Sequence, residues 1–420
     1  MDILVIGSGG REHALVANLS DKADVGRLFA LPGNAGMASC ATLVPIGAKE
    51  LDRIVLFAKQ EKVDFVVVGP DDPLVLGLVD LLEAEGIPCF GPDKRSAILE
   101  GSKVFAKDLM KRYKIPTAAY EVFDRVEDAL AYAKTCALPS VVKADGLALG
   151  KGVIIAHTKE ALQKAIKAMM VDKVFGSSGE RIVVEEFLTG FEVSVLTFTD
   201  GVSLVPLPSS MDHKRAFDGD QGPNTGGMGV IAPNPYYTPE LQELCMQQIF
   251  LPTMAAMNKE GRTFKGCLYF GLMLTPDGPK VIEYNARFGD PELQAVLPLL
   301  ESDLLPILLA VSQQRLKDVE VKFSNQASCC VVLASGGYPT SYETGKRITL
   351  GKFEEGLVCL HAGTRFDGTT LVTNGGRVMN LVATAQTLKE AVEKAYRSVD
   401  SVSFDGMQYR KDIGKVALEA

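Results

Sequence analysis

The sequence lacks an unbroken run of 18 apolar residues, has no Cys-x-x-Cys pair and contains only four histidines. A helix that crosses a bilayer needs about 20 mostly apolar residues, so we expect no membrane-spanning segment. The eight cysteines are scattered and do not cluster with the histidines, which argues against a zinc site and for free thiols in a reducing compartment. The N-terminus also lacks the basic segment of a signal peptide. We therefore expect a cytoplasmic protein with no membrane partner.

Positive charge is also in short supply. Lysine and arginine total 44 against 52 aspartates and glutamates, so the net charge is −8. A nucleic-acid surface needs an excess of basic groups, and we therefore expect no nucleic-acid partner. A nucleotide needs only a few local lysines and backbone amides, so it is not excluded. With 420 residues, of which 47% are hydrophobic, the chain is expected to form about two to four globular domains.

Residues 1–100 alternate between predicted strands and helices, which indicates a doubly wound parallel sheet. The first turn, Gly7 to His13, resembles a dinucleotide site but has Glu12 where the third glycine is required. The second predicted strand ends at Pro32-Gly33-Asn34 and lacks the acidic residue that binds ribose. This argues against an NAD-dependent oxidoreductase. The turn can still cradle a phosphate or simply pack a strand on a helix, and its residues do not decide between these roles.

A second glycine-rich segment differs from a Walker A loop. Residues 139–155 predict a strand, a loop and another strand, with Gly150, Lys151 and Gly152 in the loop. A Walker A loop leads into a helix and has Ser or Thr where Gly152 stands. A flexible hairpin can nevertheless close over a polyphosphate. Lys143 lies on the first strand and is costly to bury without an anionic partner, so it indicates phosphate binding more strongly than Lys151 does.

Other charged residues stand at the ends of predicted elements. Ser102 is a good cap for a helix that carries Lys103 and Lys107 on one face. Glu185 and Glu186 end a predicted strand, where they could bind an adenine amino group or ribose hydroxyls. Each of these features alone would also suit a solvated surface.

The densest group of functional side chains lies at residues 283–292. Glu283 and Asn285 are two apart on a predicted strand, so they share one face, and two oxygen ligands suit Mg²⁺ bound together with phosphate oxygens. Arg287 offers a planar fork for a carboxylate or phosphate. Asp290 and Pro291 have the residue types of an N-cap and first helical position. A solvated strand end would explain any one of these residues, but the cluster favours a functional site.

Residues 212–229 form a long segment rich in charge and glycine. It contains Asp212-His213-Lys214-Arg215 and Gly222-Pro223-Asn224-Thr225-Gly226-Gly227-Met228-Gly229. Loops of this length inside a compact domain are usually functional or disordered. His213 alone would more often be a surface histidine, and only its neighbours favour a functional role.

Taken together, these motifs resemble the ATP-grasp superfamily and, within it, the glycinamide ribonucleotide synthetase family. The resemblance covers essentially the whole chain and includes Arg287-Phe288-Gly289-Asp290-Pro291-Glu292 besides the segments quoted above. One departure is Leu293, where the family usually has threonine. The resemblance implies a multidomain α/β and α+β protein: an N-terminal α/β domain (1–101), an ATP-grasp central domain (102–123 and 191–325), an ATP-grasp lid (124–190) and a small C-terminal α+β domain (326–420).

The family reaction joins glycine to 5-phosphoribosylamine with ATP in purine biosynthesis. It passes through an acyl phosphate and yields glycinamide ribonucleotide, ADP and phosphate. The resemblance thus implies an ATP-dependent C–N ligase that uses ATP with Mg²⁺ or Mn²⁺. It is expected to be a monomer or weak dimer. Phosphoryl transfer needs alignment and charge neutralisation more than covalent help, which agrees with the absence of a visible catalytic triad.

Roles for individual residues also follow from the resemblance. The metal would be bound by Glu283 and Asn285, and the catalytic residues would be Arg287, Asp290 and Asp212. ATP would be bound by Lys103, Lys143, Gly150, Lys151, Gly152, Glu185, Phe187 and Glu192. The amine substrate would be bound by Gly9, Gly10, Asn34, His213, Lys214, Asn224, Thr225, Gly226 and Gly227.

Two alternatives remain. Another ATP-grasp carboxylate–amine ligase or a carboxylase would use the same ATP chemistry, and residues 212–215 and 222–229 count against it. A non-catalytic nucleotide-binding regulator would be expected to lack metal ligands or phosphate-binding lysines, and both are present here.

Overall fold

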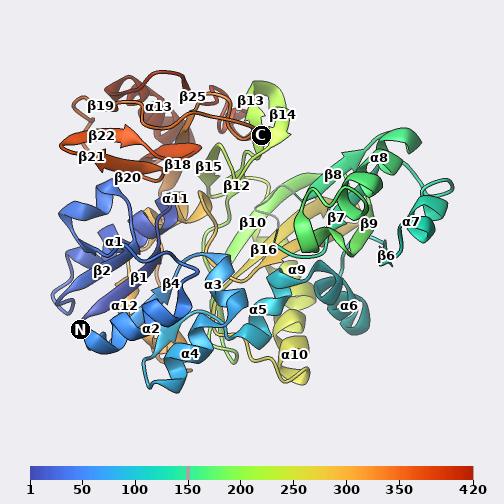
Figure 1. Ribbon diagram of the computed structural model, residues 1–420, viewed down its shortest axis with the longest axis horizontal. Coiled ribbons are helices and arrows are strands. Elements are labelled where there is room, and N and C mark those ends of the chain that lie inside the picture. The colour runs from blue at the N-terminus through green and yellow to red at the C-terminus, as the bar shows by residue number, and fades with distance from the viewer. Residues whose placement is uncertain (148–151, 420) are drawn as a thin grey trace.

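The N-terminal unit is a parallel sheet with helices on both faces, in a computed structural model that describes residues 1–147 and 152–419 (Figure 1). Its strand order is β3-β2-β1-β4-β5. Every residue of β1 is buried, and alternate side chains enter two different hydrophobic cores. The predicted doubly wound sheet is therefore confirmed. The elements are β1 (Ile3–Gly7), α1 (Gly10–Ser20), β2 (Leu28–Pro32), β3 (Thr42–Leu43), α2 (Leu51–Gln60), β4 (Phe65–Val68), α3 (Asp71–Leu76), α4 (Leu78–Ala84), β5 (Cys89–Phe90) and α5 (Lys94–Gly101).

The central unit is an antiparallel sheet with the order β11-β10-β16-β17. It shares both cores with the N-terminal unit. Phe270 packs in the core that contains Leu4, and Phe198 packs in the core that contains Val5. The two units are therefore fixed relative to each other by apolar burial. The elements are α6 (Lys103–Tyr113), β10 (Phe191–Thr199), β11 (Leu204–Pro206), α9 (Pro239–Cys245), α10 (Leu251–Lys259), β16 (Gly266–Thr275) and β17 (Gly278–Asn285).

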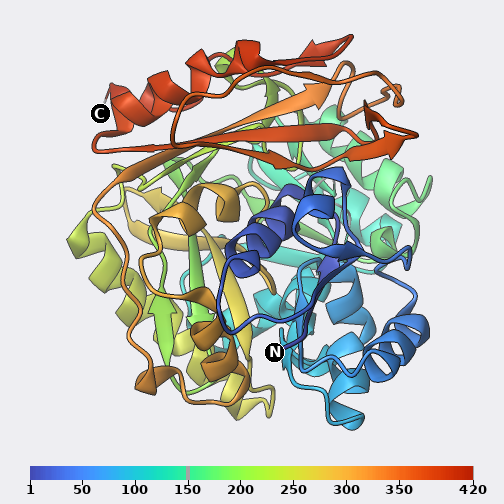
Figure 2. The ribbon, with the colours of Figure 1, turned by 90° about the vertical axis from the view of Figure 1, so that its left-hand side faces the viewer.

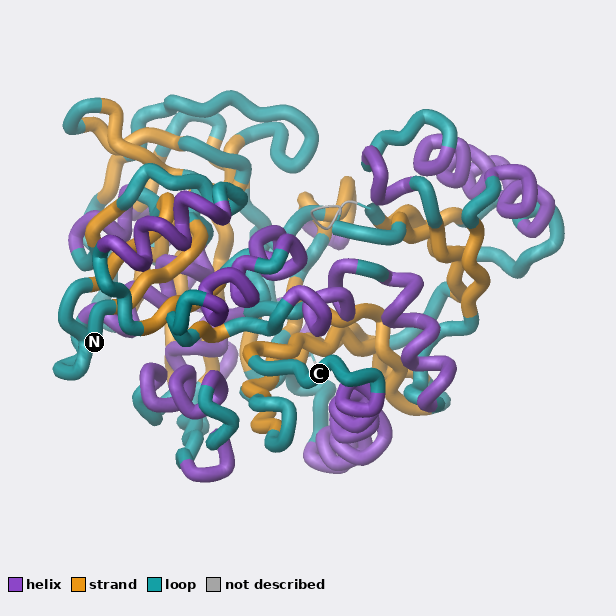
Figure 3. Tube along the Cα trace, turned by 60° about the horizontal axis from the view of Figure 1, so that its bottom comes forward, coloured by secondary structure: helices purple, strands orange, loops and turns teal. Residues whose placement is uncertain are grey.

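The lid has a sheet and a core of its own. Its strand order is β6-β9-β7-β8, and Val142, Ile166 and Val184 belong to a separate apolar cluster. Helices α7 and α8 lie at the end of the molecule farthest from the N-terminal unit (Figures 1 and 3). Because β6 pairs with β9, this sheet begins at Tyr120 rather than at the predicted boundary of 124. The elements are β6 (Tyr120–Phe123), α7 (Val126–Tyr132), β7 (Ser140–Ala144), β8 (Val153–Ala156), α8 (Lys159–Met170) and β9 (Ile182–Glu186).

The C-terminal unit lies across the N-terminal and central units (Figure 2). Its main sheet has the order β12-β15-β18-β23-β20, so it includes two strands from the 212–229 region that the sequence assigned to the central domain. This region is therefore anchored in the C-terminal sheet. The elements are β12 (Met211–Asp212), β13 (Arg215–Phe217), β14 (Gln221–Asn224), β15 (Gly229–Ala232), β18 (Ala327–Ser335), β19 (Thr349–Leu350), β20 (Leu357–His361), β21 (Thr364–Asp367), β22 (Thr370–Thr373), β23 (Arg377–Ala385), α13 (Leu388–Arg397), β24 (Val402–Ser403), β25 (Met407–Gln408) and α14 (Lys415–Leu418).

The segment after β17 corrects one local prediction. Helix α11 (Glu292–Val296) begins two residues after Asp290, with Pro291 in the N-cap position, so Asp290 is not the cap. Its carboxylate instead accepts a hydrogen bond from Gln294 and pairs with Arg377. The chain leaves α11 through a 3₁₀ turn that contains Pro298 and continues into α12 (Leu304–Ser312), so the helix breaks at Pro298 as expected.

All eight cysteines are free thiols, as expected from their spacing. No helix in the described ranges is long and apolar enough to cross a membrane.

A pair of buried histidines joins the N-terminal and C-terminal units. The backbone amide of His361 donates a hydrogen bond to Nδ1 of His13 at 2.7 Å. Burial lowers the pKa of His13 from 6.5 to about 4, and it has the same effect on His361. His13 is only 7% exposed, so its imidazole is held in the neutral form at the junction of the two units.

This burial predicts that stability decreases as the pH falls from 6.5 towards 4. The unfolded chain takes up a proton at His13 in that range and the folded chain does not, which costs up to about 3 kcal/mol for a shift of this size. The variant His13→Asn keeps an acceptor near the amide of His361. Between pH 7 and 4.5 we expect its unfolding free energy to fall by less than that of the wild type. Denaturant titrations at several pH values test this. The control is His157→Asn at an exposed histidine, whose curve should parallel the wild type. Parallel curves for all three proteins would contradict the prediction.

Candidate active site

The end of β17 presents Glu283 and Asn285 on one face, as the sequence predicted. A β-bulge at Ile282 shifts the pairing with β16, and beyond it Glu283 lies opposite Gly271 and Asn285 opposite Tyr269. Although burial opposes it, the nearby lysines, Lys214 foremost, lower the pKa of Glu283. The described residues contain no group of three or more His, Cys, Asp or Glu side chains that could enclose a metal. Two oxygen donors on an open face suit a cation whose remaining ligands are phosphate oxygens and water.

Lys143 has the anionic partner that its position on a buried strand requires. Its Nζ lies 3.0 Å from Oε2 of Glu185 and donates to the carbonyl oxygen of Ile282 at 2.9 Å. Lys107 also pairs with Oε2 of Glu185, at 3.2 Å. The carboxylate of Glu185 is therefore engaged by two lysines. The contact with adenosine that the resemblance implies for Glu185 stays a prediction. Its Oε1 is buried and has no hydrogen-bond partner among the described residues.

The structure also describes four other predicted ATP-binding residues, namely Lys103, Gly152, Phe187 and Glu192. Nζ of Lys103 donates to the carbonyl oxygen of Gly146 at 2.9 Å, which ties it to the start of the glycine loop. Gly152 accepts a hydrogen bond from the amide of Ala144 at 2.9 Å just before β8. Phe187 follows β9 and Glu192 lies in β10. Gly150 and Lys151 lie outside the described residues.

Lys214 and Arg287 are both held by acids. Nζ of Lys214 is 3.2 Å from Glu192 and 3.8 Å from Glu283, and Glu192 contributes most to raising the pKa of Lys214 well above its usual value. The guanidinium of Arg287 is 3.1 Å from Glu100, and its Nη2 donates to Oδ1 of Asn285 at 3.3 Å. No local motif pointed to Glu100, which lies in α5 of the N-terminal unit.

Glu100 has a second contact with the same strand end. Its Oε2 accepts a hydrogen bond from the amide of Ala286 at 2.6 Å. Burial raises the pKa of Glu100 to about 7, and Arg287 opposes that rise. The carboxylate thus fixes both the backbone after Asn285 and the guanidinium that follows it.

Asp212 is an acid with an unused oxygen. Oδ1 of Asp212 is buried and has no hydrogen-bond partner within the described part of the chain. Burial, followed by the charge of Glu292, raises the pKa of Asp212 well above its usual value. Glu292 is itself buried and accepts a hydrogen bond from the hydroxyl of Tyr269 at 3.0 Å. Glu292 therefore has a partner besides the helix that it begins. The carboxylate of Asp212, which can bind a proton, lies beside Gly227.

His213 is the second local correction. Its Nδ1 lies 3.1 Å from the carbonyl oxygen of Gly229, and its Nε2 accepts a hydrogen bond from the amide of Gly414 at 3.1 Å. With both nitrogens engaged and the ring buried, His213 supports the loop from inside and has no free ring nitrogen for a substrate. Thr225 also has a bracing role, since its hydroxyl donates to the carbonyl oxygen of Lys214 and accepts from the amide of Gly227. Asn224 pairs with Arg215 across the β13–β14 hairpin.

A cavity of about 580 Å³ lies where the N-terminal, central and C-terminal units meet. Its lining brings together the predicted residues Gly9, Asn34 and Asp290 with residues that the sequence did not single out, namely Tyr338, Thr364, Arg365, Asn374 and Arg377. These last residues are separated from the first turn by more than 300 positions, which is why local motifs could not reveal them.

Contacts around the first turn limit what it can bind. The amide of Gly9 donates to Oε2 of Glu12 at 2.7 Å, so it is not free for a phosphate. Gly10 is required by packing, because a Cβ there would lie 2.3 Å from Nδ2 of Asn380. The side-chain Nδ2 of Asn34 donates to the carbonyl oxygens of Ser8 and His361, each at 2.9 Å, so this side chain braces the cavity wall.

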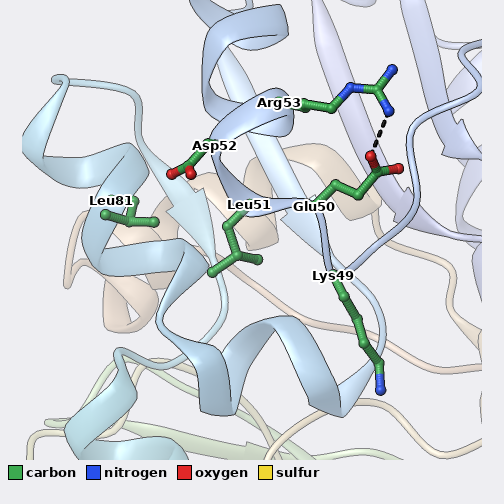
Figure 4. A pocket seen from close by; sticks show the side chains of 6 residues that line it. All are labelled: Lys49, Glu50, Leu51, Asp52, Arg53 and Leu81. Atoms are coloured by element: carbon green, nitrogen blue, oxygen red, sulfur yellow. Dashed lines mark hydrogen bonds and ion pairs between the residues drawn. The ribbon is translucent and has the colours of Figure 1, made fainter.

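A second depression involves Lys49, Arg53 and their neighbours at the start of α2 (Figure 4). Three of its charged groups are already paired, since Arg53 pairs with Glu50 and Lys49 pairs with Asp72. It therefore offers no ligand site comparable with the cavity.

Models of the phosphoribosylglycinamide synthetase family match three consecutive parts of the chain. The N domain matches residues 1–100, the ATP-grasp (A) domain residues 101–293 and the C domain residues 328–416. The three matched domains thus follow one another along the chain in the order N, ATP-grasp and C.

Curated relatives agree with these models. A phosphoribosylamine–glycine ligase of Halalkalibacterium halodurans is 47% identical over 100% of this chain and 97% of its own length. One from Caldanaerobacter subterraneus subsp. tengcongensis is 46% identical over 98% of this chain and 99% of its own length. A bifunctional purine biosynthetic protein of Schizosaccharomyces pombe is 47% identical over 99% of this chain, which covers 53% of that protein.

Two solved structures resemble this chain to different degrees, one in both sequence and fold and the other in fold alone. The phosphoribosylamine–glycine ligase of Thermotoga maritima has a TM-score of 0.85 at 36% identity and covers 98% of this chain and 100% of its own. Biotin carboxylase of Campylobacter jejuni has a TM-score of 0.77 at 15% identity, covering 100% of this chain and 95% of its own, and shares the fold alone. Together with the full-length relatives, these matches show that the chain belongs to the phosphoribosylglycinamide synthetase family of ATP-grasp ligases.

Proposed function

We propose that this chain joins glycine to 5-phosphoribosylamine in two steps. In the first, the glycine carboxylate attacks the γ-phosphorus of ATP, and ADP leaves. In the second, the sugar amine attacks the carbonyl carbon of glycyl phosphate, phosphate leaves and the amine gives up a proton. The observation that carries the proposal is the face formed by Glu283 and Asn285, which is bordered by Lys143, Lys214 and Arg287.

The metal site consists of Glu283 and Asn285, and its donors suit Mg²⁺ or Mn²⁺. Glu283 and Asn285 would hold the cation, which would supply neutralisation of the charge on the phosphate groups during phosphoryl transfer. Lys214 lies 3.8 Å from Glu283, so it balances the carboxylate from one side.

Lys103 and Lys143 bind the phosphates of ATP. Both ammonium groups are anchored, Lys143 by Glu185 and Lys103 by the carbonyl oxygen of Gly146, so they need little reorganisation when the nucleotide binds. Adenosine lies against Phe187, with Glu192 near its ribose.

Arg287 orients the carboxylate of glycine and then its acyl phosphate. Its planar fork matches both groups, and Glu100 on α5 holds it in place at 3.1 Å. Arg287 is therefore a preorganised cation at the position where two anionic groups react.

Asp212 accepts the proton that the attacking amine loses. Its Oδ1 has no other partner in the described structure, and a carboxylate whose pKa is raised is a better base near neutral pH. Glu292 provides the negative charge that holds the pKa of Asp212 up. The phosphoribosyl group occupies the cavity between Gly9 and Arg377. We also propose that the chain acts in the cytoplasm as a monomer or weak dimer, without nucleic acid or membrane.

The first test concerns the acyl acceptor. ADP release should require glycine, 5-phosphoribosylamine and Mg²⁺ together, because only the complete set lets both steps proceed to turnover. A coupled assay for ADP, with each component omitted in turn, measures this. Unchanged turnover without glycine would sink the proposal.

Glu283→Gln should reduce kcat by about 10²-fold or more, as loss of an electrostatic partner at a reacting phosphate does. Circular dichroism and thermal unfolding should show that the fold survives. The control is Glu301→Gln, which makes the same chemical change at an exposed residue and should match the wild type. Full activity of Glu283→Gln at limiting Mg²⁺ would remove the metal assignment.

The proton acceptor predicts a pH dependence with a defined sign. The rate should fall as the pH drops through the pKa of Asp212, because the protonated acid cannot accept a proton. Glu292→Gln removes a neighbouring negative charge, so it should lower the pKa of Asp212 and move the acid limb of the kcat profile to lower pH. Asp212→Asn should lose that limb together with most of the rate. An acid limb at the same pH in Glu292→Gln would refute the role of this pair.

A further inference from the structure

Arg377, the first residue of β23, reaches out of the C-terminal unit to two loops of the ATP-grasp region. Its Nη1 donates hydrogen bonds to the carbonyl oxygens of Gly226 and Asp290, each at 2.7 Å. Its Nη2 lies 3.1 Å from Oδ1 of Asp290. One guanidinium therefore joins the glycine loop to the start of α11, two segments more than 60 residues apart in the chain.

Tyr338 holds the same glycine loop from a neighbouring position. Its hydroxyl accepts a hydrogen bond from the amide of Gly226 at 3.1 Å. A Cβ on Gly226 would lie 3.0 Å from the Cζ of Arg377, so the loop backbone passes close against the guanidinium. Two side chains of the C-terminal unit thus fix both the carbonyl and the amide of one glycine.

The loop held in this way borders the parts of the site that handle the amine. A Cβ on Gly227 would lie 2.6 Å from Oδ1 of Asp212, the proposed proton acceptor. Arg377, Tyr338 and Asp290 also line the cavity assigned above to the phosphoribosyl group. The same contacts therefore determine the shape of the cavity and its distance from Asp212.

We propose that Arg377 is a positioning residue for the amine substrate, fastening Gly226 and Gly227 to Asp290 so that the cavity and Asp212 keep their relative places. This inference rests on the proposed function of the cavity. The positive charge of Arg377 is balanced by Asp290 at 3.1 Å, so Arg377 contributes through the geometry of its hydrogen bonds. A guanidinium has five donors in a rigid fork, whereas the ammonium of lysine is a single point on a flexible stem. A lysine at position 377 should therefore keep the positive charge but lose the hydrogen bonds that link Gly226 to Asp290.

The experiment compares Arg377→Lys and Arg377→Gln with the wild type for all three substrates. We expect both variants to raise KM for 5-phosphoribosylamine at least tenfold, while KM for ATP and for glycine stay within twofold. Tyr338→Phe removes one hydrogen bond from the same loop and should show the same pattern with a smaller change. If either Arg377 variant fails to fold, Tyr338→Phe still tests whether contacts to Gly226 affect KM for the amine. Arg347→Gln is the matched control, because it removes an exposed arginine of the same unit and should leave all constants unchanged.

Two kinetic outcomes would overturn the inference. Wild-type KM for the amine in Arg377→Lys would mean that charge alone matters. Unchanged KM values for every substrate with a lower kcat would reduce Arg377 to a general structural role. Calorimetric binding of ribose 5-phosphate separates these outcomes from failure of the proposed function. We expect the wild type to bind it and Arg377→Lys to bind at least tenfold more weakly. Equal binding by both proteins refutes the positioning role, and no binding by the wild type removes the cavity assignment on which it rests.

Discussion

The active-site region depends on keeping several cations close together and partly out of water before any phosphate arrives. An unpaired buried charge costs several kcal/mol, so each cation needs a fixed acid nearby. Lys143 has Glu185, Arg287 has Glu100, and Lys214 lies between two glutamates. Most of these glutamates therefore pair with lysines and an arginine of the same region. The result is a set of donors already oriented towards an incoming anion, which lowers the reorganisation that phosphoryl transfer requires.

This electrostatic arrangement can exist only because the units are held rigidly together. Glu100 belongs to the N-terminal unit, yet it binds the backbone and guanidinium that follow β17 of the central unit. Such a contact needs the two units to be fixed to within a fraction of an ångström. Their shared apolar cores provide that, since the strand residues of both sheets pack into the same two clusters. The lid has a separate core, and so it is the unit best suited to move relative to the site.

Local sequence patterns predicted the shared face of Glu283 and Asn285, but they did not predict the partners of Asp290 and His213. The two-residue spacing of Glu283 and Asn285 predicts a shared face because strand geometry is set locally. Asp290 failed as a cap because a distant residue, Arg377, and the amide of Gln294 compete for its carboxylate. Both ring nitrogens of His213 are engaged by backbone groups, those of Gly229 and of the distant Gly414, which its local sequence could not reveal. Spacing shows which side chains share a face, but partners more than about 80 residues away are fixed only by the fold.

The likeness to biotin carboxylases is a likeness of fold alone. A TM-score of 0.77 at 15% identity means that the ATP-grasp framework is common to enzymes with different acceptors. The shared fold therefore does not by itself identify the acceptor. In this chain the segment of residues 212–229, which includes the proposed proton acceptor Asp212, begins and ends in strands β12 and β15 of the C-terminal sheet. Its glycines are held by side chains of that same unit. On the proposed assignment, the C-terminal unit is thus part of the active site, and changes in it can alter the choice of amine while leaving the ATP site intact.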